Sequence, residues 1–279
     1  MNESSGFSGN FGGETQFVGA NKNTSARIIY YLKKRHTFGK MRMEVQDMEG
    51  NKMLSLSPGK SKGINIVTWN FNILAPKMAE GKTMSFGGFT SPRVPAGNYK
   101  IVLTKGKKIY EQVIEIKYDE KSIATIEQRN AQEEMTRKLY NMVEDLAFMV
   151  YEINSMIFET EEVIKDHPKG KKKAEKLKSA LETLIKDLVI TTGDNYVASA
   201  EPELREKMGT LYSGVATSYD RVSGAQQDNF ELISESFEKA KAKYQEILNN
   251  EGKKFNSFLE KNSIDPDQLK SKEEFLKKN

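Results

Sequence analysis

The chain of 279 residues has no cysteine, only two histidines and a single tryptophan. The absence of cysteine excludes disulfide bonds, thiolate catalysis and cysteine-ligated metals. His36 and His167 lie far apart in regions of different composition, which argues against a histidine-based triad or a zinc site. No apolar run approaches the roughly 18 residues that a membrane-spanning helix needs. The first residues, MNESSGFSGNFGG, lack the basic and apolar regions of a signal peptide.

Motifs for nucleotide binding or hydrolysis are also missing. Gly59–Ser61 and Gly81–Thr83 look like the end of a phosphate-binding loop, but the glycine required five residues earlier is replaced by Leu54 and Pro76. Carboxylates are abundant, so counting does not exclude a pair suited to glycoside hydrolysis. Most of them, however, lie on the polar faces of predicted helices. We therefore expect no enzymatic activity, no cofactor and no bound metal.

The charge and glycine content divide the chain into two parts. Residues 1–118 contain 18 Lys/Arg and 8 Asp/Glu, a net charge of +10, whereas residues 119–279 contain 25 and 31, a net charge of −6. The first part also holds 14 of the 20 glycines. Because several independent quantities change together, the sequence predicts a domain boundary near residues 118–122.

The first part has the pattern of a small β-sandwich. Strand-like runs occur at residues 26–34, 41–56 and 63–72, and a hairpin turns at Lys105-Gly106. Six or seven short strands predict an immunoglobulin-like or fibronectin III-like sandwich over residues 15–118, preceded by a flexible segment, residues 1–14.

The second part has the period of amphipathic helices. Helices are predicted near residues 126–166 and 171–192, after Ser199, and from Ser223 to about Phe258. Thr125 and Gln128 form a plausible capping box. The sequence predicts an antiparallel helical bundle of about four helices over residues 119–264 and a loosely ordered tail over residues 265–279.

Four residues are candidates for contact with a partner. Trp69 is either a core residue, which its apolar neighbours favour, or a platform on which a sugar ring stacks. Phe86 and Phe89, in SFGGF, are candidate exposed aromatics, and Arg93 is a candidate partner for the acidic start of the first helix. The lysines of the first part are distributed over loops and strand edges, which favours a solvated surface over a nucleic-acid site.

The order of segments resembles that of a known family. IIYYLKKR, GKMRMEVQDMEGNKM, GINIVTWNF and PRVPAGNYKIVLT are followed by LYNMVEDLAFMVYEINSM and LREKMGTLYSGVATSYDRVSGAQQDNFE. This series is similar to the C-terminal region of exported Bacteroidetes proteins with a sortilin-like or BNR-repeat β-propeller, often labelled glycosyl hydrolase-like. The segment from Trp69 to Tyr99 also resembles the immunoglobulin-like module of flagellar hook-capping proteins.

The resemblance implies a location and a partner but no site residue. It covers about residues 15–260, and no Asp-box of a propeller blade occurs in the chain. The expected function is therefore a non-catalytic docking module, periplasmic, outer-membrane-associated or extracellular, that holds a propeller in cis or in trans or binds another cell-envelope protein. Any catalytic surface would lie in the propeller. The alternative is a carbohydrate-binding accessory region of a glycoside hydrolase-like protein; neither a nucleic acid nor a membrane span is expected.

Overall fold

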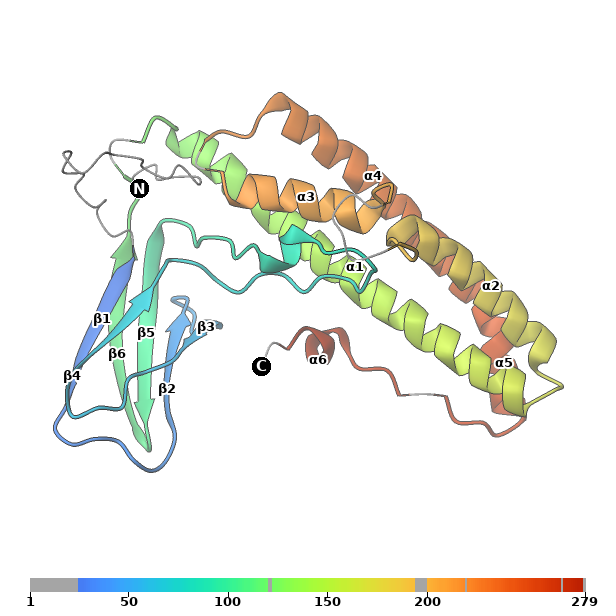
Figure 1. Ribbon diagram of the computed structural model, residues 1–279, viewed down its shortest axis with the longest axis horizontal. Coiled ribbons are helices and arrows are strands. Elements are labelled where there is room, and N and C mark those ends of the chain that lie inside the picture. The colour runs from blue at the N-terminus through green and yellow to red at the C-terminus, as the bar shows by residue number, and fades with distance from the viewer. Residues whose placement is uncertain (1–24, 120–121, 194–199, 219, 267, 278–279) are drawn as a thin grey trace. The chain divides into compact units, whose positions relative to one another are not determined.

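The computed structural model describes residues 25–119, 122–193, 200–218, 220–266 and 268–277 (Figure 1). The predicted flexible segment, residues 1–14, lies outside the described residues. Over these described residues the structure is mixed, with six strands in two sheets followed by helices. Its contacts divide it into a strand unit, residues 1–74 and 91–129, and a helical unit, residues 75–90 and 130–279.

The strand unit contains two antiparallel sheets. Strands β1 (Ala26–Leu32) and β4 (Gly63–Trp69) form one sheet. The other has the order β3-β2-β5-β6, with β2 (Met41–Gln46), β3 (Lys52–Leu56), β5 (Gly97–Lys105) and β6 (Lys108–Ile116). Strands β5 and β6 form the predicted hairpin, in which Gly106 has a φ of 59°. Glycine tolerates this positive φ because it has no Cβ.

The two sheets share one hydrophobic core. Its buried members are Met43, Val45, Val67, Trp69, Val94, Tyr99, Ile101 and Ile116. Trp69 is only 1% exposed, and its indole N–H donates a hydrogen bond of 2.9 Å to the carbonyl of Asn72. Phe71 and Tyr99 contact its ring edge to face. The prediction that Trp69 is a core residue is confirmed.

The helical unit contains most of α1 (Ile126–Asp166) together with α2 (Lys171–Leu188), α3 (Leu204–Ala216), α4 (Gly224–Ile247), α5 (Lys253–Lys261) and α6 (Lys272–Leu276). The apolar stripe of α1 packs with those of α2, α3, α4 and α5 in a second core that includes Leu139, Leu181, Tyr212 and Phe237. The burial of these stripes stabilises the helices far more than their intrinsic propensity does.

Capping boxes fix the starts of two long helices. Thr125 and Gln128 exchange side-chain-to-backbone hydrogen bonds at the start of α1, so the predicted capping box is confirmed. Ser223 and Gln226 form the same arrangement at the start of α4. The predicted fourth helix is interrupted, because a π-helical turn, η2 (Leu248–Gly252), separates α4 from α5.

The last described residues make specific contacts. Ser271 caps α6 through a capping box with Glu274, and the ring of Phe275 stacks on that of Tyr151 in α1 at a centroid distance of 4.8 Å. Lys77 Nζ lies 3.6 Å from the centroid of the Phe275 ring, and it donates a hydrogen bond of 2.6 Å to the backbone carbonyl of Phe275. The sequence predicts a loosely ordered tail over residues 265–279, because a single apolar pair, Phe275 and Leu276, is too short to show a helical repeat.

Candidate functional site

Residues 75–90, between β4 and β5 in the sequence, belong to the helical unit. We call them the clamped segment. The sequence pattern predicts them as part of the sandwich over residues 15–118, whereas the contacts of the structure assign them to the helical unit. The reason is physical: the backbone of this segment is hydrogen-bonded mainly to residues around α3 and not to a sheet. The connection from Trp69 to Gly97 is also much longer than a typical loop between strands.

Arg205, near the start of α3, fixes the first half of the clamped segment. Its Nε donates a hydrogen bond of 2.6 Å to the carbonyl of Ala79, and its Nη1 donates one of 3.1 Å to the carbonyl of Thr83. Nη1 also pairs with Glu206 Oε1 at 2.5 Å, and the hydroxyl of Thr83 donates to the same oxygen. Arg205 is 6% exposed. A buried guanidinium with several partners holds backbone carbonyls in fixed positions.

Tyr212 and Ser213, about two turns further along α3, fix the second half. The Tyr212 hydroxyl donates a hydrogen bond of 2.8 Å to the carbonyl of Thr90, and the Thr90 and Ser213 hydroxyls lie 2.8 Å apart. Burial raises the pKa of Tyr212 far above its ordinary value, with smaller contributions from Tyr140 and Glu144. The Tyr212 hydroxyl therefore stays protonated and remains a donor.

Between these two attachments lies a short 3₁₀ helix, η1 (Phe86–Phe89), beside α3 (Figure 1). Its backbone approaches α3 closely, with Gly87 buried against Gly209. The absence of both side chains permits the approach.

The clamped segment presents three large apolar side chains to solvent. Met84, Phe86 and Phe89 are 51%, 58% and 75% exposed. The sequence identifies both phenylalanines as candidate contact residues, and the structure places both on η1. Met84 was not proposed, although the composition TMSFGGFT contains the signal: three bulky apolar residues in a glycine-rich run with no strand alternation.

A groove of about 640 Å³ lies along the same segment. It is lined by residues 76–81, Met84, Ser85, Gly88, Phe89 and, from α3, Arg205. The groove thus joins two exposed apolar side chains, Met84 and Phe89, to a buried cation.

The remaining two candidate residues lie elsewhere, in the strand unit. Trp69 is removed from the set of contact residues, because a ring that is 1% exposed offers no face to a sugar. Arg93 is half-buried and its backbone forms an isolated bridge with Asn72. Burial, and secondarily the positive charge of Arg129, lower the pKa of Arg93.

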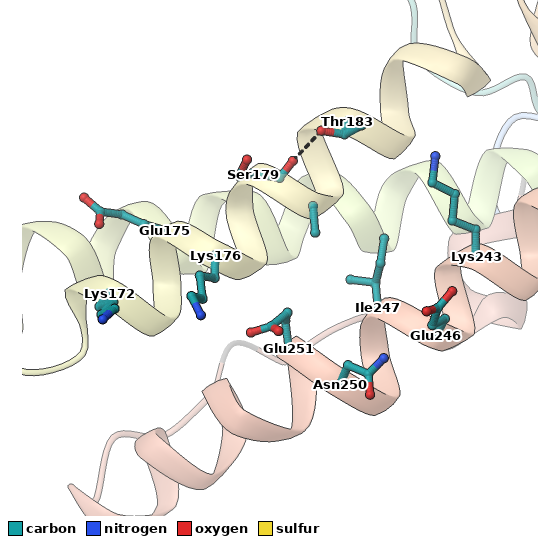
Figure 2. A pocket seen from close by; sticks show the side chains of 11 residues that line it. Lys172, Glu175, Lys176, Ser179, Thr183, Lys243, Glu246, Ile247, Asn250 and Glu251 are labelled. Atoms are coloured by element: carbon teal, nitrogen blue, oxygen red, sulfur yellow. Dashed lines mark hydrogen bonds between the residues drawn. The ribbon is translucent and has the colours of Figure 1, made fainter.

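A second groove of about 640 Å³ lies between α2 and the junction of α4 with η2 (Figure 2). Its lining includes three lysines and three glutamates: Lys172, Lys176, Lys243, Glu175, Glu246 and Glu251. Figure 2 shows these long side chains spread along the walls, and the dashed line is the hydrogen bond from the Thr183 hydroxyl to the Ser179 carbonyl. Mixed charges on largely exposed side chains do not select a ligand of one charge.

In the part of the chain that the structure describes, no group of three or more His, Asp or Glu side chains is arranged to hold a metal ion. Among the same described residues, no helix combines the length and the apolar content needed to cross a membrane.

Comparison of the chain with protein-family models, with curated proteins and with solved structures gives no match.

Proposed function

We propose that this protein is a non-catalytic interaction module and that the clamped segment is its binding surface. The observation that carries the proposal is the exposure of Met84, Phe86 and Phe89 on a backbone held by buried hydrogen bonds from Arg205 and Tyr212. Aromatic residues and methionine are enriched in protein interfaces. Because the backbone is already fixed, binding orders little more than side chains, and this lowers its entropic cost.

The architecture proposed with it is an immunoglobulin-like sandwich followed by an antiparallel helical bundle. The core shared by the two sheets supports the first part, and the common core of α1 to α5 supports the second. Both cores are filled with aliphatic and aromatic side chains.

The partner we propose is a β-propeller of a cell-envelope protein, in cis or in trans, and the location is correspondingly the periplasm, outer membrane or cell surface. The sequence resemblance to the C-terminal region of sortilin-like or BNR-repeat proteins supports this choice. A carbohydrate ligand is the second candidate. It is favoured by one observation, the exposed rings of Phe86 and Phe89, since aromatic faces suit the apolar face of a sugar.

The test uses a propeller encoded with this chain, either in the same reading frame or in a neighbouring gene. The two proteins are produced separately, and their affinity is measured by titration calorimetry. Phe86→Ser and Phe89→Ser are expected to weaken binding at least about tenfold each, as interface aromatics do. The matched control is Phe158→Ser on α1, which removes a ring that is 57% exposed outside the clamped segment.

The outcomes are distinct. Equal affinity for the wild-type protein and both serine variants contradicts the proposed surface. Specific binding on a glycan array that disappears in Phe86→Ser and Phe89→Ser but persists in Phe158→Ser replaces the protein partner with a carbohydrate.

A further inference from the structure

Three connections of the strand unit meet at one end of its sheets. Strand pairing places Leu32 beside Gly63, Met41 beside Lys105, and Lys105 beside Lys108. The β1–β2, β3–β4 and β5–β6 connections therefore leave the sheets at the same end, as Figure 1 shows for the β1–β2 loop and the β5–β6 turn. We call residues 33–40, 57–62 and 105–108 the basic loop cluster.

Backbone hydrogen bonds connect these loops to one another. The amide of His36 donates to the carbonyl of Lys60 at 2.9 Å, and the amide of Gly106 donates to the carbonyl of Lys40 at 3.0 Å. A ring nitrogen of His36 also lies 3.1 Å from the carbonyl of Gly39. The three loops thus form one continuous surface.

The charge of this surface has one sign. It contains nine basic residues and no Asp or Glu: Lys33, Lys34, Arg35, Lys40, Lys60, Lys62, Lys105, Lys107 and Lys108. Eight of the nine are exposed, and Lys105 is half-buried. Among the described residues none of the nine is in an ion pair. Half of the 18 Lys/Arg of residues 1–118 therefore gather here, although the sequence suggested that they were dispersed.

Exposed apolar side chains lie within and beside these charges. Phe38, in the β1–β2 loop, is 89% exposed. On the outer face of the adjoining sheet, Tyr31 and Ile64 are paired across the strands and are 63% and 71% exposed. Further along the same face, Ile29 is paired with Ile66, and these are 61% and 48% exposed. An apolar face thus continues from the charged end along β1 and β4.

We propose that the basic loop cluster docks the strand unit onto the surface of a bilayer that contains anionic lipids. The headgroup region takes up both kinds of side chain present: lysine and arginine are attracted to anionic headgroups, while phenylalanine enters the boundary with the acyl chains. A nucleic acid would also attract the charges and could stack a base on Phe38. A nucleic acid, however, would offer no apolar environment in which the aliphatic side chains of Ile64 and Ile66 could be buried, whereas the boundary of a bilayer does.

The test is vesicle binding by the full chain. Vesicles of phosphatidylcholine with about 30% phosphatidylglycerol are compared with vesicles of pure phosphatidylcholine, at low salt and at about 0.5 M salt. We expect binding only to the anionic vesicles, and weaker binding at high salt. Lys33→Glu/Lys34→Glu/Arg35→Glu should lower the partition coefficient by about 100-fold or more. Phe38→Ser should lower it about tenfold.

The matched control for charge is Lys171→Glu/Lys172→Glu/Lys173→Glu, which makes the same change in net charge on three exposed lysines of α2. It should bind like the wild-type protein. Phe38→Trp provides a direct signal, since its fluorescence should shift to the blue on anionic vesicles and be quenched by brominated acyl chains. Trp69, being buried, should not respond.

Three results would overturn the proposal. They are equal binding to neutral and anionic vesicles, equal loss of binding in the two triple variants, and tight binding of a fluorescent duplex DNA by a protein that ignores the vesicles. The last result would assign the basic loop cluster to nucleic acid instead. None of them bears on the clamped segment, which belongs to the helical unit.

Discussion

Gly87 and Gly209 meet so closely that a Cβ added to Gly87 would lie 2.9 Å from the Cα of Gly209 and 3.1 Å from its carbonyl oxygen. Both of those atoms are backbone, so neither can rotate away. Gly87→Ala is therefore expected to separate η1 from α3 and to destabilise the protein by about 1–3 kcal/mol, the usual cost of overpacking. Chemical denaturation measures this change.

The control for that prediction is Gly214→Ala in α3, the helix that also contains Gly209, because nothing lies within 4 Å of a Cβ added at Gly214. Alanine should there be neutral or stabilise α3 by up to about 1 kcal/mol through its helix propensity. Gly209→Ala should fall between the two, since its added Cβ meets the ends of flexible side chains, Ser85 Oγ and Met78 Cε. Equal stability of the Gly87→Ala and Gly214→Ala variants would contradict the close backbone contact between η1 and α3.

Arg205→Met should be strongly destabilising. The substitution removes the side chain that donates hydrogen bonds to two backbone carbonyls. It also leaves the carboxylate of Glu206 without its cation, and one oxygen of that carboxylate is already buried without a hydrogen-bond partner. Breaking a buried ion pair from one side typically costs about 3–5 kcal/mol. Hydrogen exchange of residues 79–90 should rise together with this loss.

Lys207→Met is the matched substitution, since Lys207 is exposed two residues further along α3. Unchanged exchange at residues 79–90 in Arg205→Met would mean that Arg205 does not hold the clamped segment.

Glu152 gives a pH dependence with a defined sign. Burial raises the pKa of this carboxyl, while a hydrogen bond from Tyr244 opposes the shift. A raised pKa means that the folded protein holds the proton more tightly than the unfolded chain does. The stabilisation that this proton provides is therefore fully present below the ordinary glutamate pKa of about 4.3. It is lost as the pH rises from that value through the higher pKa of the folded state. Glu152→Gln should match the wild-type protein at low pH and exceed its stability at neutral pH.

Urea denaturation at several pH values measures this difference. Glu235→Gln provides the opposite case, because a hydrogen bond from Lys239 lowers the pKa of Glu235. The stability of the Glu235→Gln variant relative to the wild-type protein should therefore fall, not rise, toward neutral pH. If Glu152→Gln behaves in the same way as Glu235→Gln, the burial of Glu152 does not govern its ionisation.

Trp69→Ala should unfold or severely weaken the strand unit. Replacing a large buried aromatic residue by alanine typically costs about 3–5 kcal/mol, and Trp69 additionally loses its ring contacts with Phe71 and Tyr99. In the wild-type protein, iodide should quench the tryptophan fluorescence only weakly. Efficient quenching, or an unchanged melting temperature in the alanine variant, would contradict its place in the core.

The elements that sequence analysis predicted are those whose signals are local. The first helix was expected near residues 126–166, and α1 spans Ile126–Asp166, because a capping box and a long apolar period mark it. The hairpin at Lys105-Gly106 was found from its glycine. The interruption of the fourth helix at η2 was missed, because the apolar period continues through it from Ile247 to Phe255.

The candidate site depended on contacts that no short pattern contains. Phe86 and Phe89 were identified as exposed aromatics, but their support comes from Arg205 and Tyr212, more than 110 residues later. A buried arginine near the start of a helix looks in the sequence like any solvated one. The basic loop cluster was missed for a similar reason, since strand register alone brings its three loops together.

The clamped segment also has a consequence for biosynthesis. Ala79 is made 126 residues before Arg205, the side chain that binds its carbonyl. At translation rates of about 5–20 residues per second, the segment waits for about 6–25 s on the ribosome before its partner helix exists. During that time α3 is not yet available to cover Met78 and Ala79, which later pack in the helical core. The strand unit can complete its sheets during this interval, whereas the helical unit cannot complete its core until α3 has been made.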